Sequence, residues 1–333
     1  MTPYRTGLYR LIFGAAAAYN IAFGLWAALA PRSFFATFEL TPPVYPSIWA
    51  CLGMVIGLYG LGYAYAAARI ERAAPFIAIG LLGKLLGPAG WILTVIRGEW
   101  PIRTLTLILF NDVIWWLPFA LFLLEGTRLA RSMRRLAPAA CAATNLVGII
   151  AMATTLRFGT EIVPLPADRI AYIAAHPILW RGGWCAWIAS GVTLVAFYAW
   201  WGGFLERPRW GLVAVAIAAV GLSCDFAGES ILIAWLPRHY ESLARAATLL
   251  SGAAANGLYT LAGIVLTIAT PSLRGLLRAL TWAVWLVGGA LTALAIAGLP
   301  LGIAVSTAIL FALFCPWVLL IGWSLRSRQA ALL

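Results

Sequence analysis

The fold is decided by residues 74–124, APFIAIGLLGKLLGPAGWILTVIRGEWPIRTLTLILFNDVIWWLPFALFLL. This stretch contains two apolar runs of about twenty residues, the length that an α-helix needs to cross ~30 Å of hydrocarbon. Each run carries one ionisable residue in its interior, Lys84 in the first and Asp112 in the second. Lys84 is the only lysine of the chain, whereas the arginines lie mostly between apolar runs. The stretch therefore predicts two transmembrane helices, each with a single intramembrane charge.

The rest of the chain repeats this pattern, and we predict ten transmembrane helices in all. Hydrophobic residues make up 63% of the sequence and charged residues 10%, far from the roughly half apolar and quarter charged composition of soluble domains. The expected spans are residues 9–30, 46–68, 74–96, 104–124, 138–156, 182–204, 210–236, 247–270, 279–298 and 300–323. The predicted fold class is an all-α polytopic membrane helix bundle.

The arginines between the spans predict how the helices are oriented. Fourteen arginines fall on the side of the N-terminus and eight on the opposite side. Because cytoplasmic loops carry the excess of basic residues, we expect both termini in the cytoplasm and the chain in a bacterial inner (plasma) membrane. The net charge of +12 is explained by arginines that face anionic lipid headgroups. Membrane lipid is therefore an expected partner, and nucleic acid is not.

The most polar connection on the predicted cytoplasmic side divides the chain. It spans residues 126–137 and contains four arginines, two of them adjacent at Arg134 and Arg135. We predict a four-helix membrane module over residues 1–125, a basic cytoplasmic linker over 126–137, and a six-helix membrane module over 138–333. A five-plus-five division would suit an inverted-repeat transporter, but the two halves share no matching motif.

Three segments of the first module carry a resemblance to a known family. They are WACLGM at residues 49–54, GKLLGP at 83–88 and NDVIWW at 111–116. With them, the N-terminal third of the chain resembles a small family of uncharacterised four-helix proteins of the bacterial inner membrane. The resemblance implies a four-helix fold unit and brings no activity with it.

Lys84 and Asp112 are expected at a similar depth, roughly 12–14 Å into the membrane at 1.5 Å per residue. Either charge alone would cost at least ~2.5–3.5 kcal/mol in hydrocarbon, and two neighbouring antiparallel helices would let the charges offset each other. One interpretation is a structural ion pair that fixes helix packing. Another is a functional lysine or carboxylate at a cavity whose rim contains Asn111, Trp115 and Trp116. Snorkelling of either side chain to the membrane surface suits this depth poorly.

A second polar group lies in the seventh predicted span, which contains Asp225 and Glu229. Carboxylates four residues apart share one face of a helix, and they repel unless a proton, a cation or an arginine lies between them. This spacing predicts a site for a proton, a cation or a substrate, completed by Asn256, Tyr259 and Thr260 of the antiparallel eighth span. Two other interpretations stay open: a polar patch satisfied by neighbouring helices, and a position of Glu229 near the outer headgroups.

His176 and His239 are weak candidates for metal ligands. Both fall on the predicted outer side, in different loops, and together with glutamates they have the chemistry to bind zinc or iron. No H-E-x-x-H pattern and no histidine inside a span supports a metal, so we expect neither a metal nor a cofactor. Tryptophans near span ends, such as Trp200, Trp201 and Trp210, are expected to anchor the chain at the membrane surface.

These features leave three classes of function. The sequence has no nucleotide-binding motif, which argues against ATP-driven transport by this chain alone. The first hypothesis is a secondary transporter or permease for a small solute. The alternatives are an intramembrane enzyme that acts on a lipid or isoprenoid-like substrate with a neutral carboxylic acid as general acid, and a non-catalytic membrane scaffold. Transport predicts a cavity open to water, catalysis predicts one open to lipid, and a scaffold predicts tight contacts around the charges.

Overall fold

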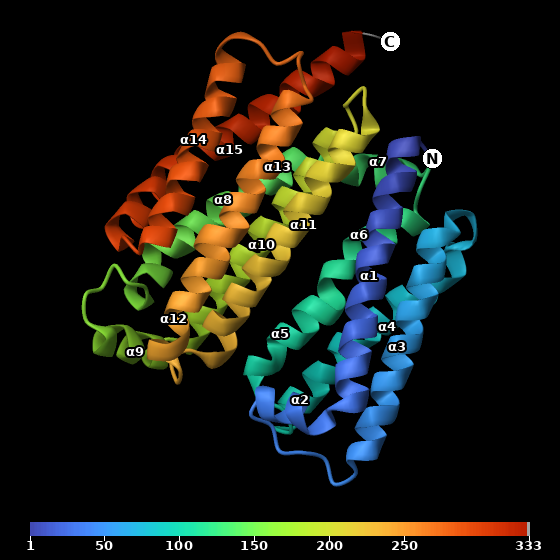
Figure 1. Cartoon of the computed structure of the whole chain (residues 1–333), viewed down its shortest axis with the longest axis vertical. Coiled ribbons are helices and arrows are strands. Elements are labelled where there is room, and N and C mark those ends of the chain that lie inside the picture. The colour runs from blue at the N-terminus through green and yellow to red at the C-terminus, as the bar shows by residue number, and fades with distance from the viewer. Residues whose placement is uncertain (332–333) are drawn as a thin grey trace. The chain divides into compact units, whose positions relative to one another are not determined.

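The computed structural model describes residues 1–331, with side chains as far as Ser327, and it contains helices and turns but no strand within that range (Figure 1). Ten helical stretches of the described chain are long and apolar enough to cross a membrane. They are Pro3–Leu29, Pro46–Ala68, Ala74–Ile96, Ile102–Leu123, Ala137–Thr154, Pro177–Gly202, Pro208–Trp235, Tyr240–Ile268, Gly275–Ala297 and Pro300–Ser327. The predicted all-α membrane bundle is confirmed, and the chain is a multi-pass integral membrane protein.

The chain forms two compact units, Met1–Ala130 and Arg131–Leu333. The helices of the first unit are α1 (Pro3–Leu29), the short α2 (Pro31–Thr37), α3 (Pro46–Ala68), the 3₁₀ turn η1 (Ile70–Arg72), α4 (Ala74–Ile96), the 3₁₀ turn η2 (Ile102–Thr104), α5 (Leu105–Ile108), the π-helical turn η3 (Leu109–Val113) and α6 (Ile114–Leu123). The fourth span is thus one continuous helix in which the hydrogen-bond pattern changes three times, from 3₁₀ to α, to π and back to α.

Helices α1 and α3 pack side by side with their backbones in contact (Figure 1). A Cβ atom built on Gly24 of α1 would lie 2.6 Å from the backbone nitrogen of Gly57, and one on Gly53 of α3 would lie 2.6 Å from that of Ala28. Because no side chain separates the helices at these points, the glycines allow the close approach that is typical of membrane helix pairs.

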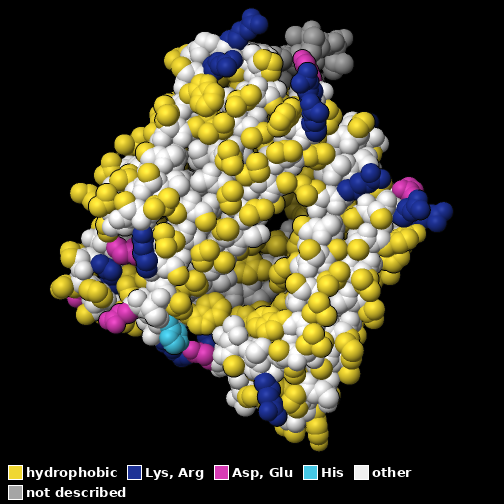
Figure 2. Space-filling model, viewed as in Figure 1, with side chains coloured by type: hydrophobic (Ala, Val, Ile, Leu, Met, Phe, Trp, Pro, Cys, Tyr) yellow, Lys and Arg dark blue, Asp and Glu magenta, His cyan; other side chains and the backbone are white. Residues whose placement is uncertain are grey.

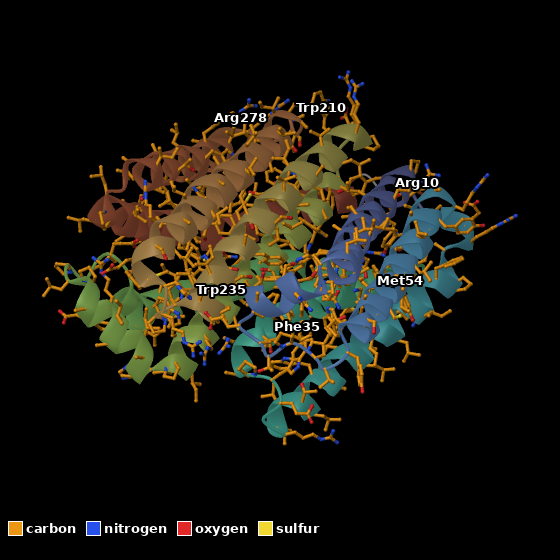
Figure 3. All side chains as sticks on the ribbon, turned by 60° about the horizontal axis from the view of Figure 1, so that its bottom comes forward. Arg10, Phe35, Met54, Trp210, Trp235 and Arg278 are labelled. Atoms are coloured by element: carbon orange, nitrogen blue, oxygen red, sulfur yellow. The ribbon has the colours of Figure 1, made fainter. Side chains whose placement is uncertain are left out.

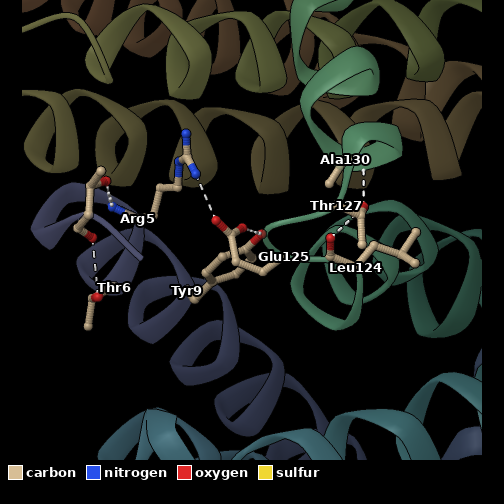
Figure 4. Close-up of polar contacts among 8 residues, drawn as sticks. Arg5, Thr6, Tyr9, Leu124, Glu125, Thr127 and Ala130 are labelled. Atoms are coloured by element: carbon tan, nitrogen blue, oxygen red, sulfur yellow. Dashed lines mark hydrogen bonds and ion pairs between the residues drawn. The ribbon is translucent and has the colours of Figure 1, made fainter.

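Aromatic side chains fill the middle of the first unit. Phe13, Tyr63 and Phe119 come from three different spans, are 0–2% exposed and pack edge to face. Toward the N-terminus, the Glu125 carboxylate accepts hydrogen bonds from Arg5 Nη1 at 2.7 Å and from the Tyr9 hydroxyl at 3.3 Å (Figure 4). These contacts join the end of the fourth span to the start of the first.

The second unit contains the other six spans. Its elements are the end of α7 (Arg128–Arg135), which leads into it from the first unit, then α8 (Ala137–Thr154), η4 (Leu156–Gly159), α9 (Pro166–Ala175), α10 (Pro177–Gly202), α11 (Pro208–Ser230), the π-helical turn η5 (Ile231–Trp235), α12 (Tyr240–Thr248), the π-helical turn η6 (Leu249–Ala255), α13 (Asn256–Ile268), α14 (Gly275–Ala297) and α15 (Pro300–Ala331). Helix α14 is followed by Gly298, whose φ of +67° is the left-handed conformation that favours glycine.

Three buried tryptophans form the centre of the core of the second unit. The indole nitrogens of Trp201, Trp285 and Trp317 each donate a hydrogen bond to a threonine hydroxyl, at 2.8–3.1 Å. Trp201 is 0% exposed, so the expectation that it anchors the chain at the membrane surface is wrong. The threonine partner makes burial of the indole possible, because a buried N–H needs an acceptor. Trp210 differs, since it is 41% exposed at the start of α11 (Figure 3).

The surface between the helix ends is apolar. On the face drawn in Figure 2, the charged side chains lie toward the ends of the helices and the flanks between them are largely hydrophobic. Leu58, Leu86 and Leu286 are 61–72% exposed on the sides of their spans. This pattern suits contact with acyl chains, because the exposed side chains are apolar and the backbone polar groups form their hydrogen bonds within each helix.

Candidate intramembrane carboxylate site

Helix α11 carries the two intramembrane carboxyl groups of the second unit. Asp225 and Glu229 lie one turn apart in the last two turns of the helix, so they share one of its faces. Asp225 is 4% exposed and Glu229 is 0% exposed. Both groups therefore lie inside the helix bundle and do not face lipid.

The Asp225 carboxylate is held by two hydroxyl groups. Ser251 Oγ donates to Asp225 Oδ1 at 2.6 Å, and the Tyr259 hydroxyl donates to Asp225 Oδ2 at 3.1 Å. The Tyr198 hydroxyl of α10 donates to the Tyr259 carbonyl at 3.1 Å, which ties α13 to α10 next to the site. Two O–H donors can satisfy an ionised carboxylate, because hydrogen bonds to the charged form stabilise it.

Glu229 has the opposite environment. Neither of its carboxyl oxygens has a hydrogen-bond partner, and both are enclosed by other atoms of the described chain. No arginine or lysine within 4 Å forms an ion pair with it among the described residues. An isolated ionised carboxylate would be very costly in such a place, whereas a neutral carboxylic acid is tolerated. The pair thus consists of one buried carboxylate with two hydrogen-bond donors and one buried carboxyl group with none.

Irregular helical turns border both carboxyl groups. The π-helical turn η5 begins directly after Ser230, and the turn η6 contains Ser251. Such turns release backbone carbonyls from the α-helical pattern and are frequent at functional sites. Within η5, two carbonyls accept hydrogen bonds from the start of α10: Trp180 Nε1 donates to Leu232 O at 2.7 Å and Arg181 Nε donates to Ile233 O at 3.4 Å.

A glycine of α10 faces the Asp225 carboxylate. A Cβ atom on Gly191 would lie 3.1 Å from Asp225 Oδ2 and 3.0 Å from the Tyr259 hydroxyl oxygen. Any side chain at this position would press on the hydrogen bond between these two groups. Because Gly191 has no side chain, the Asp225 carboxylate and the Tyr259 hydroxyl have room to form their hydrogen bond.

The structure brings Tyr259 to Asp225 as described, but it gives Asn256 other partners. Asn256 Nδ2 donates to the Gly288 carbonyl at 2.7 Å and to Thr292 Oγ1 at 2.8 Å. Both acceptors belong to α14. Asn256 therefore joins α13 to α14 and makes no hydrogen bond to either carboxyl group.

The Lys84 and Asp112 side chains approach each other in the first unit. Lys84 Nζ lies 3.9 Å from Asp112 Oδ1, and both residues are 4% exposed. Lys84 Nζ also donates to the backbone carbonyl of Asn111, and Asn111 Nδ2 donates to Asp112 Oδ1 at 2.9 Å. Trp116 Nε1 donates to the Lys84 carbonyl at 2.8 Å, whereas Trp115 Nε1 donates to the Phe110 carbonyl within its own helix.

This ion pair resembles the carboxylate site in two respects. Asn111 and Asp112 lie in the π-helical turn η3, and a glycine again faces the carboxylate. A Cβ atom on Gly87 of α4 would lie 2.9 Å from Asp112 Oδ2. The Asn111 Oδ1 atom is buried and lacks a hydrogen-bond partner. The polar centre of the first unit is therefore compact, with one acceptor left unsatisfied.

The two histidines lie far apart in the chain and neither joins a cluster of ligands. His176 Nδ1 is 3.1 Å from the Tyr172 carbonyl, and its ring stacks on that of Tyr172 at 4.6 Å. His239 precedes α12. Over the part of the chain that the structure describes, no three His, Cys, Asp or Glu residues come together as a metal site.

Ser251, Gly87 and Gly191 are the site residues that the sequence reasoning missed. Ser251 lies 26 positions from Asp225, and in the sequence it is one of several small residues of its span. The GKLLGP segment did contain Gly87, which helical spacing places one turn after Lys84. Gly191 carries no comparable local signal, because its partners come from two other helices.

No protein-family model, curated protein or solved structure matches the chain.

Proposed function

We propose that this integral membrane protein is a secondary transporter of a small solute, in which Glu229 binds the coupling proton and Asp225 is its ionised neighbour. The observation that carries the proposal is the bare Glu229 carboxyl, 0% exposed and without a hydrogen-bond partner. Such a group is stable there as the neutral acid, and it becomes ionised only when water or a cation reaches it. Occupancy by a proton is therefore coupled to opening of the site, which is what proton-driven transport requires.

The neighbouring contacts support this assignment. Asp225 is held by Ser251 and Tyr259 at 2.6 and 3.1 Å, so it supplies a fixed negative charge beside Glu229. The π-helical turns η5 and η6 give the helices on both sides of the site an irregular backbone, and unwound or irregular segments at ligand sites are common in transporters. In this reading, the described structure is the closed state of the transport cycle.

A membrane scaffold is the second candidate, because one specific observation favours it. Lys84, Asp112, Asp225 and Glu229 are all 4% exposed or less, and buried ionisable groups can serve to specify helix packing alone. An intramembrane enzyme would use the same neutral Glu229 as a general acid, since a protonated carboxyl in an apolar site can donate a proton. A location in the bacterial inner membrane fits the arginine distribution and the resemblance of the N-terminal third.

The first test asks whether Glu229 holds a proton. Infrared difference spectra of the purified protein between low and high pH report the C=O stretch of protonated carboxylic acids. We expect a band at neutral pH that Glu229→Gln removes and that the matched control Glu241→Gln, an exposed carboxylate of α12, leaves in place. A band that is absent, or that is unchanged in Glu229→Gln, would contradict the proposal.

The second test distinguishes a transporter from a scaffold or an enzyme. Proteoliposomes loaded with a pH-sensitive dye are exposed to a small-molecule extract of bacterial cells, and proton movement is recorded. We expect extract-dependent proton flux with the unsubstituted protein and with Glu241→Gln, and loss of it with Glu229→Gln. Equal signals from all three proteins and from empty liposomes would favour the scaffold, whereas chemical conversion of added lipid extract without flux would favour the enzyme.

A further inference from the structure

Arg131, Arg135 and Arg326, which form no ion pair with the described carboxylates, lie where α7 meets the last turns of α15. Arg131 and Arg135 are four residues apart on α7, and both are exposed. Like charges at this spacing face each other and destabilise a helix. No carboxylate of the described chain lies within 4 Å of either group. A bound anion would remove this repulsion.

The contrast with the first unit shows that the chain can pair its arginines when acids are present. Arg5 pairs with Glu125 at 2.7 Å, Arg103 with Glu39 at 3.6 Å, and Arg97 with Glu99 at 4.0 Å. All of these arginine–carboxylate pairs of the described residues belong to the first unit. At the junction of α7 and α15, the described side chains provide no carboxylate within 4 Å of Arg131, Arg135 or Arg326, so the surface can accept an anion from the membrane.

Helix α15 fixes a third arginine at this place. Arg326 donates through Nη2 to the Arg135 carbonyl, and its guanidinium lies over the Trp200 ring, 5.4 Å from the centroid. One turn earlier, a Cβ atom on Gly322 would lie 2.8 Å from Pro138 Cβ, so α15 and the start of α8 are in close contact. Arg326 is therefore held by the carbonyl at the end of α7 and by an aromatic face.

Apolar side chains stand beside the arginines. Trp323, one turn before Arg326, is 72% exposed, and Leu136, directly after Arg135, is 58% exposed. Exposed tryptophan next to arginine at the end of a membrane span is the arrangement found at the level of the lipid headgroups. The surface therefore offers positive charge to a phosphate group and apolar area to the acyl chains below it.

We propose that Arg131, Arg135 and Arg326 form a binding site for the phosphate headgroup of an anionic phospholipid, with its acyl chains along Trp323 and Leu136. Arginine suits this role because its planar guanidinium binds phosphate oxygens through two parallel hydrogen bonds. Arg131 and Arg135 bind the phosphate from one side of α7, and Arg326 joins this helix to the last transmembrane span. This site is independent of the carboxylate site and of the proposed transport function.

The test measures lipid binding by native mass spectrometry of the full-length protein in detergent, with phosphatidylglycerol or phosphatidylcholine added. The variant is Arg131→Gln with Arg135→Gln. The matched control is Arg274→Gln with Arg278→Gln. These two exposed arginines lie at the start of α14, and their substitution removes the same amount of charge on the same predicted side of the membrane. Thermal unfolding of each protein without added lipid establishes that the variants are folded.

We expect the unsubstituted protein and the control to bind phosphatidylglycerol more tightly than phosphatidylcholine. The Arg131/Arg135 variant should lose about fivefold in phosphatidylglycerol affinity for each arginine removed, the factor that corresponds to the usual contribution of a basic residue at an anionic surface. Equal losses in variant and control would show a general charge effect and overturn the proposal. Displacement of the lipid by inorganic phosphate at the same headgroup concentration would overturn it too, because the ligand would then be free phosphate.

Discussion

At the scale of single residues, the four intramembrane ionisable groups differ in how they are satisfied. Asp225 accepts hydrogen bonds from Ser251 and Tyr259, and Asp112 has Asn111 and, at 3.9 Å, Lys84. Glu229 has none. The free-energy cost of burying a polar group depends on its hydrogen-bond partners. Groups that are equally buried can therefore differ in this cost. Glu229 is the carboxyl group that lacks a hydrogen-bond donor to stabilise its ionised form.

The Lys84–Asp112 pair yields a prediction about stability. It separates the interaction energy between the two charges from the cost of burying each charge alone. Lys84→Met leaves the Asp112 charge buried without its cation, and loss of one partner of a buried pair costs about 3–5 kcal/mol. The double variant Lys84→Met/Asp112→Leu removes both charges, so we expect it to unfold at a higher temperature than Lys84→Met alone. Thermal unfolding in detergent of the two single variants and the double variant measures the coupling.

The control for this cycle is the exposed pair Arg97–Glu99, whose side chains are 67% and 55% exposed at a separation of 4.0 Å. Arg97→Gln should change stability by less than about 1 kcal/mol, because water already solvates both groups. If Lys84→Met and the double variant unfolded at the same temperature, Lys84 and Asp112 would not be coupled.

At the scale of helices, glycines decide how closely the elements approach. Gly24 and Gly53 bring the backbones of α1 and α3 into contact, and Gly87 and Gly191 make room for the two hydrogen-bonded carboxylates. The π-helical turns η3 and η6 carry Asp112 and the Ser251 partner of Asp225. The positions of the intramembrane polar groups thus depend on glycine contacts between helices and on π-helical turns.

A prediction at this scale concerns the contact of α1 with α3. Gly53→Ala places a Cβ atom 2.6 Å from the Ala28 nitrogen, and because this neighbour is backbone, the helices must move apart. Overpacking of this kind costs about 1–3 kcal/mol. The matched control is Gly57→Ala one turn later in α3, where nothing lies within 4 Å of the added atom. We expect thermal unfolding to show a loss for Gly53→Ala only, and equal behaviour of the two variants would refute this packing.

At the scale of the whole molecule, the distribution of arginines predicts the direction in which the chain crosses the membrane. Fourteen arginines fall on the side of the N-terminus and eight on the other, which predicts that both termini lie in the cytoplasm. Ser132 in α7 and Ala167 in α9 are exposed positions on the two predicted sides. Their orientation can be measured separately from function.

We expect a membrane-impermeant thiol reagent, applied to spheroplasts, to label Ala167→Cys and to leave Ser132→Cys unlabelled. After the membrane is opened, Ser132→Cys should react as well. The unsubstituted protein measures the background from the native cysteines, which lie within or at the ends of the spans. Labelling of Ser132→Cys in intact spheroplasts, with protection of Ala167→Cys, would reverse the predicted orientation.

The sequence by itself determined the fold class and the ten spans, because crossing hydrocarbon requires about twenty apolar residues in a helix that satisfies its own backbone. It also singled out Lys84, Asp112, Asp225 and Glu229, since charge inside such a run is costly wherever the helix lies. Only the tertiary structure decided that Ser251 and Tyr259 bind Asp225 while Asn256 binds α14. Hydrogen bonds between helices depend on rotation and register to within an ångström, and in this chain bulky aromatics, threonines and glycines from many spans set them together.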